Sequence, residues 1–511
     1  MHMIRNNQIT QWLKRRRQVV VTASSIVWLS ACAVGPDFER PASPQVQQYT
    51  ATGTQTTLNA GKDEPVQYLT PGKDISAKWW TLYRSPQLTQ VVDEAIVHNQ
   101  TLAAARATLA QVQQTLFQTQ GGYYPQLDLN ANAQRQGTSS SSKSGTASTY
   151  TLYSAGANVS YRFDLFGTTR RQVEQAAALL ENQGYQLAAA YLTLTGNTVT
   201  QAINIASIHQ QIKAVQDIIA DDEHNLQLVK LKFEAGKAAQ RDVLVAESQL
   251  ANDRVALPPL KQQLSVAQHA LAVAIGKLPG TWTAPAFDMN EFTLPTALPL
   301  SVPSELVRQR PDILAAEAKL HADSAAIGIA TSQLYPSITL SGSLGSESLT
   351  TSGLFRASSG FWSVVAGLTA PLFHGGQLQA QKQAAIYTFQ ASAADYQQTV
   401  LTAFGQVADV LRALNHDAEL VGAQKTAMDT SQASLKLQRL SYEAGKSDLL
   451  QLLDAERAYQ QARLGYVRAL AQRYQDTAQL FVAMGGGWWQ VNNLSGMEER
   501  ATSTSTSVSM P

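Results

Sequence analysis

Two long stretches of the chain repeat apolar residues at alternating spacings of four and three, the pattern of helices that pack as coiled coils. The first stretch covers residues 168–233 and the second covers 375–442. The seam of the first consists of Val173, Ala177, Leu180, Gly184, Leu187, Tyr191 and Leu194. A helix of about 65 residues is roughly 98 Å long at about 1.5 Å per residue. The pattern therefore predicts helices far longer than those of ordinary globular domains.

Both long stretches end in the same motif, KFEAGK at 232–237 and SYEAGK at 441–446. The glycines, Gly236 and Gly445, suit the left-handed position that ends a helix. Asp242 and Asp448 follow shortly afterwards, where an acidic residue favours the first turn of a new helix. We therefore expect two long helical hairpins whose tips are these motifs. Pro258-Pro259 should kink or interrupt the return helix of the first hairpin.

The period changes from helical to alternating in two shorter regions, 126–164 and 337–371. Each predicts a β-hairpin whose strands are apolar on one face and polar on the other. In the first region the apolar set is Leu127, Leu129, Ala131, Ala133, Tyr153, Ala155, Ala157, Val159, Tyr161 and Phe163. Strands of about ten residues match those of a membrane barrel. A half-buried soluble hairpin has the same local pattern, so the strands alone leave both possibilities open.

The order of these elements is repeated along the chain, with Tyr124-Pro125 and Tyr335-Pro336 each leading into a hairpin. Two tandem repeats are therefore expected. The predicted segments are a signal peptide at 1–31, an irregular segment at 32–85, repeat 1 at 86–276, a Pro-rich connector at 277–303, repeat 2 at 304–484 with its return helix at 448–484, and a disordered tail at 485–511.

The N-terminus has the features of an export signal. Basic residues at 14–17 precede a short apolar run at 19–29, which is too short to span a bilayer. Leu29-Ser30-Ala31-Cys32 then resembles a bacterial lipobox, which implies lipid attachment at Cys32, the single cysteine of the chain. A free or buried Cys32 after an ordinary signal peptide is the alternative.

Composition excludes several classes of function. Net charge is +1 and charged residues make up 15%, so no nucleic-acid footprint is expected. No hydrolase, phosphate-loop or zinc-protease motif occurs, so we expect no enzymatic activity, no cofactor and no metal. Asp221-Asp222-Glu223-His224 could suggest a metal site, but on a long helix such a run is more often a solvated face.

Four strands per chain are too few to close a barrel, and an open sheet edge cannot lie in lipid. Three chains would supply twelve strands, an even number typical of such barrels. Two chains would supply eight, and side chains would fill that interior. A pore therefore favours a homotrimer of a mostly helical chain with a small transmembrane β part.

Several motifs are similar to those of outer-membrane efflux lipoproteins of the TolC type. They occur in the order of that family over about residues 19–484: Cys32-Ala33-Val34-Gly35-Pro36-Asp37-Phe38-Glu39-Arg40-Pro41, Trp79-Trp80, Asn99, Arg310-Pro311-Asp312-Ile313, Ala316-Glu317, Gly328, Tyr442-Glu443-Ala444-Gly445 and Leu452-Leu453-Asp454-Ala455.

The resemblance implies the gated exit duct of a tripartite efflux pump for small toxic compounds such as antibiotics. A trimeric twelve-stranded β-barrel in the outer membrane would continue into a periplasmic α-barrel. The implied partners are a periplasmic adaptor and an inner-membrane transporter of the resistance-nodulation-division class. The lipid on Cys32 would anchor the protein to the outer membrane, with a long periplasmic extension.

The resemblance also implies a periplasmic gate at the second tip. Matching the family motif places Leu450 and Asp454 there, with Gln451 where some members carry an acidic residue and Asp242 at the equivalent position of repeat 1. Three leucines could narrow the axis, and three carboxylates would attract cations. Alternatively, Leu450 packs in the helical seam and Asp454 is a solvated charge.

Adaptor contact is expected at the two tips. The candidates are Gly236, Lys237, Gly445 and Lys446, although capping alone would also explain the glycines. A periplasmic coiled-coil lipoprotein without a pore is the competing function for the whole chain. The alternating strands are the feature that argues against it.

Overall fold

The computed structural model describes residues 33–490 except 52, 54, 63 and 139–147. The expected signal peptide, Cys32 and the tail beyond residue 490 lie outside the described residues. The described chain forms two compact units. The first contains 33–40, 110–182 and 317–395, and the second contains 41–109, 183–316 and 396–490.

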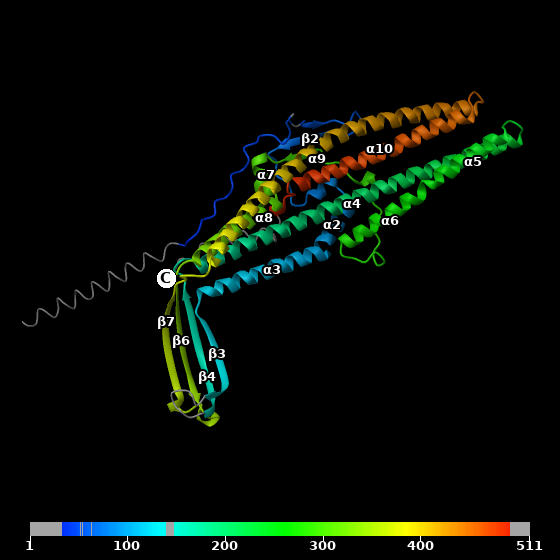
Figure 1. The fold of residues 1–511 in the computed structure, drawn as a ribbon. Coiled ribbons are helices and arrows are strands. Elements are labelled where there is room, and N and C mark those ends of the chain that lie inside the picture. The colour runs from blue at the N-terminus through cyan, green and yellow to red at the C-terminus, as the bar shows by residue number, and fades with distance from the viewer. Residues whose placement is uncertain (1–32, 52, 54, 63, 139–147, 491–511) are drawn as a thin grey trace, which may run out of the picture. The chain divides into compact units, whose positions relative to one another are not determined.

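Most of the chain is helical (Figure 1). The α-helices are α2 (Pro86–His98), α3 (Gln100–Gln120), α4 (Thr168–Glu234), α5 (Gln240–Val255), α6 (Leu257–Ala274), α7 (Pro303–Gln309), α8 (Pro311–Ser332), α9 (Gln377–Glu443) and α10 (Leu449–Ala483). Short 3-10 helices are η2 (Trp79–Tyr83), η3 (Gly121–Tyr123), η4 (Met289–Glu291), η5 (Thr351–Gly353), η6 (Ala357–Ser359) and η7 (Trp488–Gln490).

The two longest helices, α4 and α9, contain 67 residues each and lie within two residues of the ranges that the apolar spacing predicts. The return segment of repeat 2 is one helix, α10. That of repeat 1 is divided into α5 and α6 at Ala256, because Pro258 and Pro259 lack the amide hydrogens that a continuous helix needs.

The helical segment that precedes the first β-hairpin is also interrupted, at Asn99, which separates α2 from α3. Its Oδ1 accepts a hydrogen bond from the amide of Leu102 (2.9 Å), which caps the start of α3. Its Nδ2 donates to the carbonyl of Ala274 (2.8 Å), so the break is fixed by a contact with the end of α6.

The first unit contains a four-stranded antiparallel sheet in the order β3-β4-β6-β7. The strands are β3 (Gln126–Thr138), β4 (Ser148–Phe163), β6 (Ser337–Ser348) and β7 (Gly360–Thr369). The cross-strand pairs Leu127–Val159, Tyr161–Leu340 and Leu340–Ala366 align the apolar residues of all four strands on one face. The opposite face carries polar pairs, of which Asp128–Asn158 and Asn158–Ser343 are examples.

Both faces of this sheet are open in a single chain. Leu129, Trp362 and Leu368 on the apolar face are 84%, 76% and 69% exposed. Among the described residues, the outer edges of β3 and β7 pair with no further strand. An exposed apolar face of this extent and two unpaired edges are features of an interaction surface, because both are unfavourable in water.

A smaller sheet in the second unit was not expected from the sequence. It joins β1 (Thr57–Leu58), β2 (Gln67–Pro71) and β5 (Ala297–Leu300), with β2 antiparallel to β1 and parallel to β5. Its strands come from segments interpreted as irregular (32–85) and as a connector (277–303). The buried Arg473 of α10 holds it in place by donating to Gln67 Oε1 (3.0 Å) and to the Pro65 carbonyl (2.8 Å).

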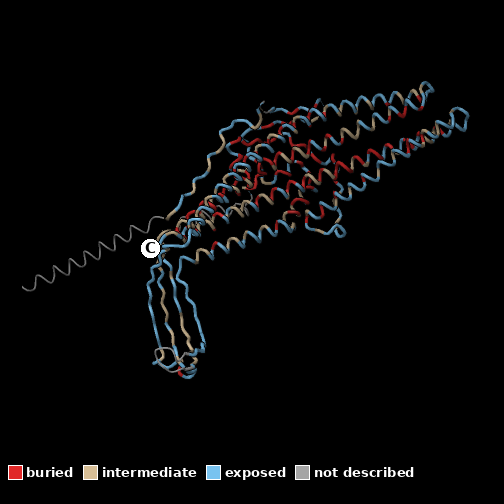
Figure 2. Tube along the Cα trace, in the orientation of Figure 1, coloured by how far each residue is buried: buried red, intermediate tan, exposed pale blue. Residues whose placement is uncertain are grey.

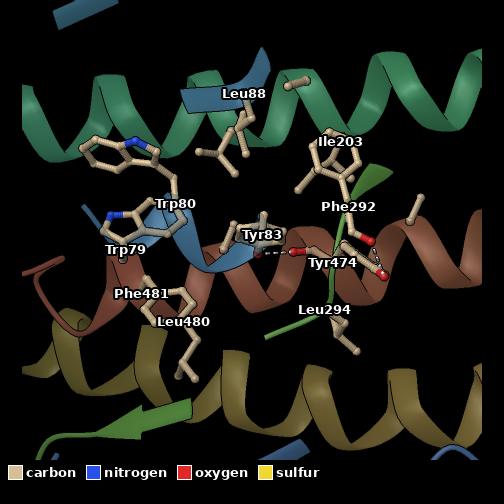
Figure 3. Packing of buried hydrophobic residues seen from close by; sticks show 14 of the residues in the cluster. Trp79, Trp80, Tyr83, Leu88, Ile203, Phe292, Leu294, Tyr474, Leu480 and Phe481 are labelled. Carbon is tan, nitrogen blue, oxygen red and sulfur yellow. Dashed lines mark hydrogen bonds between the residues drawn. The ribbon is translucent and has the colours of Figure 1, made fainter. Parts of the chain in front are cut away.

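The main core of the second unit lies among α2, α4, α10 and η2 (Figure 3). Trp79 and Trp80 are fully buried, and Trp79 stacks on Phe481 with ring centroids 5.2 Å apart. The Tyr83 hydroxyl donates to the Tyr474 carbonyl (2.8 Å). Buried residues are dense in this region and become sparse toward the hairpin tips (Figure 2).

The prediction of a disordered tail at 485–511 is wrong for residues 485–490. Gly485 to Gln490 are ordered, and Trp488 is only 8% exposed. The Trp488 Nε1 donates to the carbonyl of Gln309 (2.8 Å), so this aromatic residue is satisfied in the core and keeps the segment in place.

Candidate functional site

The two hairpin tips have the same backbone geometry. Gly236 and Gly445 adopt φ values of 68° and 70°, in the left-handed region that favours glycine. The amide of Lys237 donates to the Lys232 carbonyl (2.7 Å), and the amide of Lys446 donates to the Ser441 carbonyl (2.8 Å). These are Schellman motifs, which satisfy the last carbonyls of α4 and α9. The glycines are therefore needed for capping, whatever else the tips contact.

The return helices begin with acidic caps. The Asp448 carboxylate accepts from the amide of Gln451 (2.9 Å). In repeat 1 the acidic residue lies inside the helix instead of in front of it. Asp242, in the first turn of α5, accepts at Oδ2 from the amide of Ala239, the residue before the helix (3.1 Å). Asp242, the gate candidate of repeat 1, therefore has a capping role in the structure.

Leu450 is not part of the helical seam of its own chain. It is 53% exposed, whereas Leu449, Leu452 and Leu453 around it are buried. Those three join a small apolar cluster at the tips, whose buried members are Val229, Ala246, Leu435, Tyr442, Leu449, Leu452 and Leu453. The cluster draws on α4, α5, α9 and α10, so it joins the two hairpins. Leu450 lies outside this cluster, and its side chain is open to solvent in a single chain.

Asp454 is also exposed, on the same helix as Leu450 and one turn further on. Its Oδ1 accepts from Arg457 Nη1 (3.2 Å), and Arg457 Nη2 donates to Gln249 Oε1 on α5 (3.0 Å). Gln451 is exposed and accepts from Gln438 Nε2 on α9 (3.2 Å). The carboxylate of Asp454 is thus oriented by an arginine that also contacts the first hairpin.

A second link between the hairpins lies at the ends of the long helices. The Lys232 ammonium is 3.7 Å from the centroid of the Tyr442 ring. Burial raises the pKa of the Tyr442 phenol, and the negative charge of Asp242 raises it further. The phenol therefore stays neutral, and its ring faces a cation on the other hairpin.

A third link lies further along the hairpins. Arg439 on α9 contacts Asp221 on α4 (3.1 Å) and Glu456 on α10 (3.4 Å). Asn225 donates to Glu456 Oε1 (2.6 Å). Burial raises the pKa of Glu456, although Asn225 and Arg439 partly oppose that shift.

The proposed tip contacts Lys237 and Lys446 are exposed on the surface of the tips. The sequence did not single out Arg457, Lys232 or Asp222 as site residues. Asp222 was interpreted as part of a solvated face, yet it is only 3% exposed. A signal for its burial was present, since Asp222 falls on the same helical stripe as Val215, Ile218 and Val229.

The described residues contain no group of three or more His, Cys, Asp or Glu side chains arranged to hold a metal ion. Within the same part of the chain, no helix is both long enough and apolar enough to cross a bilayer.

In the first unit, residues 34–40 form a strap that follows Cys32 and lies on α4 and α8. The buried Arg171 donates to Asp37 Oδ1 (2.7 Å) and to Glu174 Oε2 (2.7 Å). Phe38 stacks on His321 with ring centroids 4.4 Å apart. The ion pair of Asp37 with Arg171 and the stacking of Phe38 on His321 therefore hold the strap against α4 and α8.

Comparisons with known proteins agree with this architecture. The family model described as outer membrane efflux protein matches residues 91–277 and 302–486. The chain is 28% identical to the cation efflux system protein CusC of Escherichia coli O6:H1 (90% of this chain, 97% of the relative). It is 29% identical to the toluene efflux pump outer membrane protein TtgF of Pseudomonas putida (91% and 96%).

Among solved structures, the outer-membrane channel OprN superposes with a TM-score of 0.81 at 26% identity, covering 89% of this chain and all of that one. Because the family model covers well over half of the sequence in two consecutive copies, the chain belongs to the outer membrane efflux protein family.

Proposed function

We propose that three copies of this chain form the outer-membrane exit channel of a tripartite efflux pump, closed at rest by side chains at the second tip. The observation that carries the proposal is the four-stranded sheet of the first unit. One face is apolar and exposed, the other is polar, and both edges lack partners among the described strands.

Closure of that sheet requires other chains. Pairing β7 of one copy with β3 of the next would satisfy both edges, and three copies give twelve strands. The polar face would then line the pore, and the apolar face would contact lipid. The proposed passage is passive, and no ATP-dependent or hydrolytic step is assigned to the chain.

The gate of the proposed channel consists of Leu450 and Asp454. Both are exposed on the first turns of α10 in a single chain, although the leucines around Leu450 are buried. Three leucines from three copies would narrow the axis, and three carboxylates next to them would repel one another and favour cations. Gln451 and Asp242 have local bonds that make them supporting residues of the tip.

The partners of the proposed channel are a periplasmic adaptor and an inner-membrane transporter of the resistance-nodulation-division class. The adaptor would contact the paired tips at Gly236, Lys237, Gly445 and Lys446. The two tips share one backbone geometry, so three copies would present six similar contact points.

The lipid anchor is proposed at Cys32, next to the strap at 34–40. A strap with its own ion pairs would hold the lipidated end against α4 and α8 rather than leave it tethered by lipid alone.

The cargo does not follow from family membership. Two relatives of almost equal identity to this chain are named for cations and for toluene. The inner-membrane partner is therefore proposed to select the substrate.

The competing function is a periplasmic spacer without a pore. Two measurements separate it from the channel. Native mass spectrometry of the detergent-solubilised protein should give the mass of three chains, and a monomer would contradict the proposal. In cells, Cys32→Ser should stay in the outer-membrane fraction, whereas a spacer held only by its lipid would be released into the soluble periplasm.

A further inference from the structure

A buried carboxyl group and a partly buried one meet inside the first hairpin. Asp222 on α4 is 3% exposed, and its carboxyl group is within hydrogen-bond reach of Asp253 on α5. Among the described residues, neither oxygen of Asp222 has a hydrogen-bond donor. Two ionised carboxylates are acceptors only, so they cannot bond to each other. The contact becomes favourable when the pair holds one proton.

Within the described part of the chain, no basic side chain forms an ion pair or hydrogen bond with Asp222. The groups that face it are Asp221 on its own helix, Asp253 on α5 and Glu456 on α10, and all of them are acidic. Arg439 on α9 is already shared between Asp221 and Glu456. Burial raises the pKa of Asp222 to about 8, with further increases from Asp253, Glu456 and Asp221.

The pair is connected to the proposed gate by a chain of hydrogen bonds. Gln249 Nε2 donates to Asp253 Oδ2 (2.7 Å), and Arg457 Nη2 donates to Gln249 Oε1 (3.0 Å). Arg457 Nη1 in turn donates to Asp454 Oδ1 (3.2 Å). The position of Arg457, and with it that of Asp454, therefore depends on the packing of α5 against α4.

We propose that one proton shared between Asp222 and Asp253 clamps α5 onto α4, that Gln249 and Arg457 transmit this clamp to Asp454, and that the closed tip is consequently sensitive to pH. Gln249 and Arg457 are positioning residues in this device. The link to Asp454 rests on the proposed function, whereas the proton shared between Asp222 and Asp253 is independent of it.

The direction of the pH effect follows from linkage. In a loosened tip Asp222 would be hydrated, and its pKa would return toward the ordinary value of 3.8. The closed tip then binds one more proton than the loosened tip at every pH between that value and about 8. Raising the pH through this window therefore favours opening, by at most about tenfold per pH unit, and the effect levels off above about 8.

The second hairpin supplies a matched control. Asp417 on α9 is also buried, and burial together with a hydrogen bond to Asp476 on α10 raises its pKa to about 8, although Arg473 opposes the shift. Among the described residues, no hydrogen bond or ion pair joins Asp417 or Asp476 to Arg457 or Asp454. Asp417→Asn should therefore remove a protonated carboxyl group without affecting the tip.

The shared proton is tested first by infrared spectroscopy of the purified protein, which detects the carbonyl stretch of a protonated carboxylic acid. At pH 7 the wild type should show this band, and Asp222→Asn should lose part of it. Asp253→Asn provides the same test if Asp222→Asn does not fold. A band that neither substitution reduces would overturn the proposal.

The link to the gate is tested by the open fraction in planar bilayers between pH 5 and 9. For the wild type and for Asp417→Asn, we expect the open fraction to rise up to about pH 8 and then to level off. For Asp222→Asn we expect no rise. An unchanged pH response in Asp222→Asn, or none in the wild type, would overturn the link. Absence of any channel would refute the proposed function, while the infrared result would still report on the proton.

Discussion

The Lys232 ammonium at the end of α4 lies 3.7 Å from the centroid of the Tyr442 ring at the end of α9. Both residues belong to the motif that ends the long helices, one in each copy. The two copies of the motif therefore contact each other, and the tips of both hairpins are held as one element.

This contact predicts a difference between two substitutions of Tyr442. Tyr442→Phe keeps the ring and should keep the tip closed. Tyr442→Leu removes the cation–π contact, worth about 0.5–1 kcal/mol, and should raise the open fraction roughly two- to fivefold. Bilayer conductance of the two variants at one pH measures the ratio. Equal open fractions would show that the ring is not part of the closed state.

Removal of the gate side chains should make cells permeable to large antibiotics. Leu450→Ala with Asp454→Ala widens the proposed constriction, and because both side chains are exposed it should change the stability of a single chain little. The readout is vancomycin sensitivity at matched expression. Leu244→Ala, at an exposed leucine near the first tip, is the control and should leave sensitivity unchanged. Equal sensitivity of the double variant and the wild type would count against the gate.

The strap predicts unequal effects for the two acidic partners of Arg171. Asp37 is almost fully exposed, so Asp37→Asn should cost less than about 1 kcal/mol. Glu174→Gln removes the half-buried partner of a buried guanidinium and should cost more, on the order of 3 kcal/mol. Thermal unfolding followed by circular dichroism compares the two. A larger effect at Asp37 would mean that the strap, rather than Glu174, compensates the charge of Arg171.

Two helix-interior glycines should respond in opposite directions to alanine. A Cβ on Gly328 of α8 would lie 2.8 Å from Arg171 Cγ, so Gly328→Ala should destabilise the protein by about 1–3 kcal/mol. Gly405 of α9 has open space at that position, so Gly405→Ala should stabilise the helix by about 1 kcal/mol. The midpoints of thermal unfolding should therefore move apart, and a shift in the same direction would contradict the packing around Gly328.

The sequence predicts the parts of the fold that depend on local periodicity. The apolar spacing of α4 and α9 and the alternation in β3, β4 and β6 are visible without a structure. The small sheet of β1, β2 and β5 is not, because its strands are only two to five residues long and β2 pairs with β5 across more than 200 positions. Gln67 is held in place by hydrogen bonds with the buried Arg473 and Thr477 of α10 and with the carbonyl of Pro295.

At the hairpin tips, the sequence predicts the helix caps but not the burial of individual polar side chains. Glycine capping at Gly236 and Gly445 follows from residue type, since few other residues tolerate a positive φ. The burial of Asp222 was missed because four consecutive polar residues, Asp221 to His224, suggest a solvated turn of helix. Asp222 is buried because it lies on the same helical stripe as Val215 and Ile218, which faces the neighbouring helices. The sequence alone does not show that this stripe is buried at position 222.

The measurement that tests the central claim most directly is planar-bilayer conductance of the purified protein, with the wild type beside Leu450→Ala/Asp454→Ala. A closed exit channel predicts rare, small, cation-selective openings in the wild type and larger openings in the double variant. No conductance from either protein would contradict the channel and favour the spacer without a pore. Wild-type openings as large as those of the variant would place the gate elsewhere.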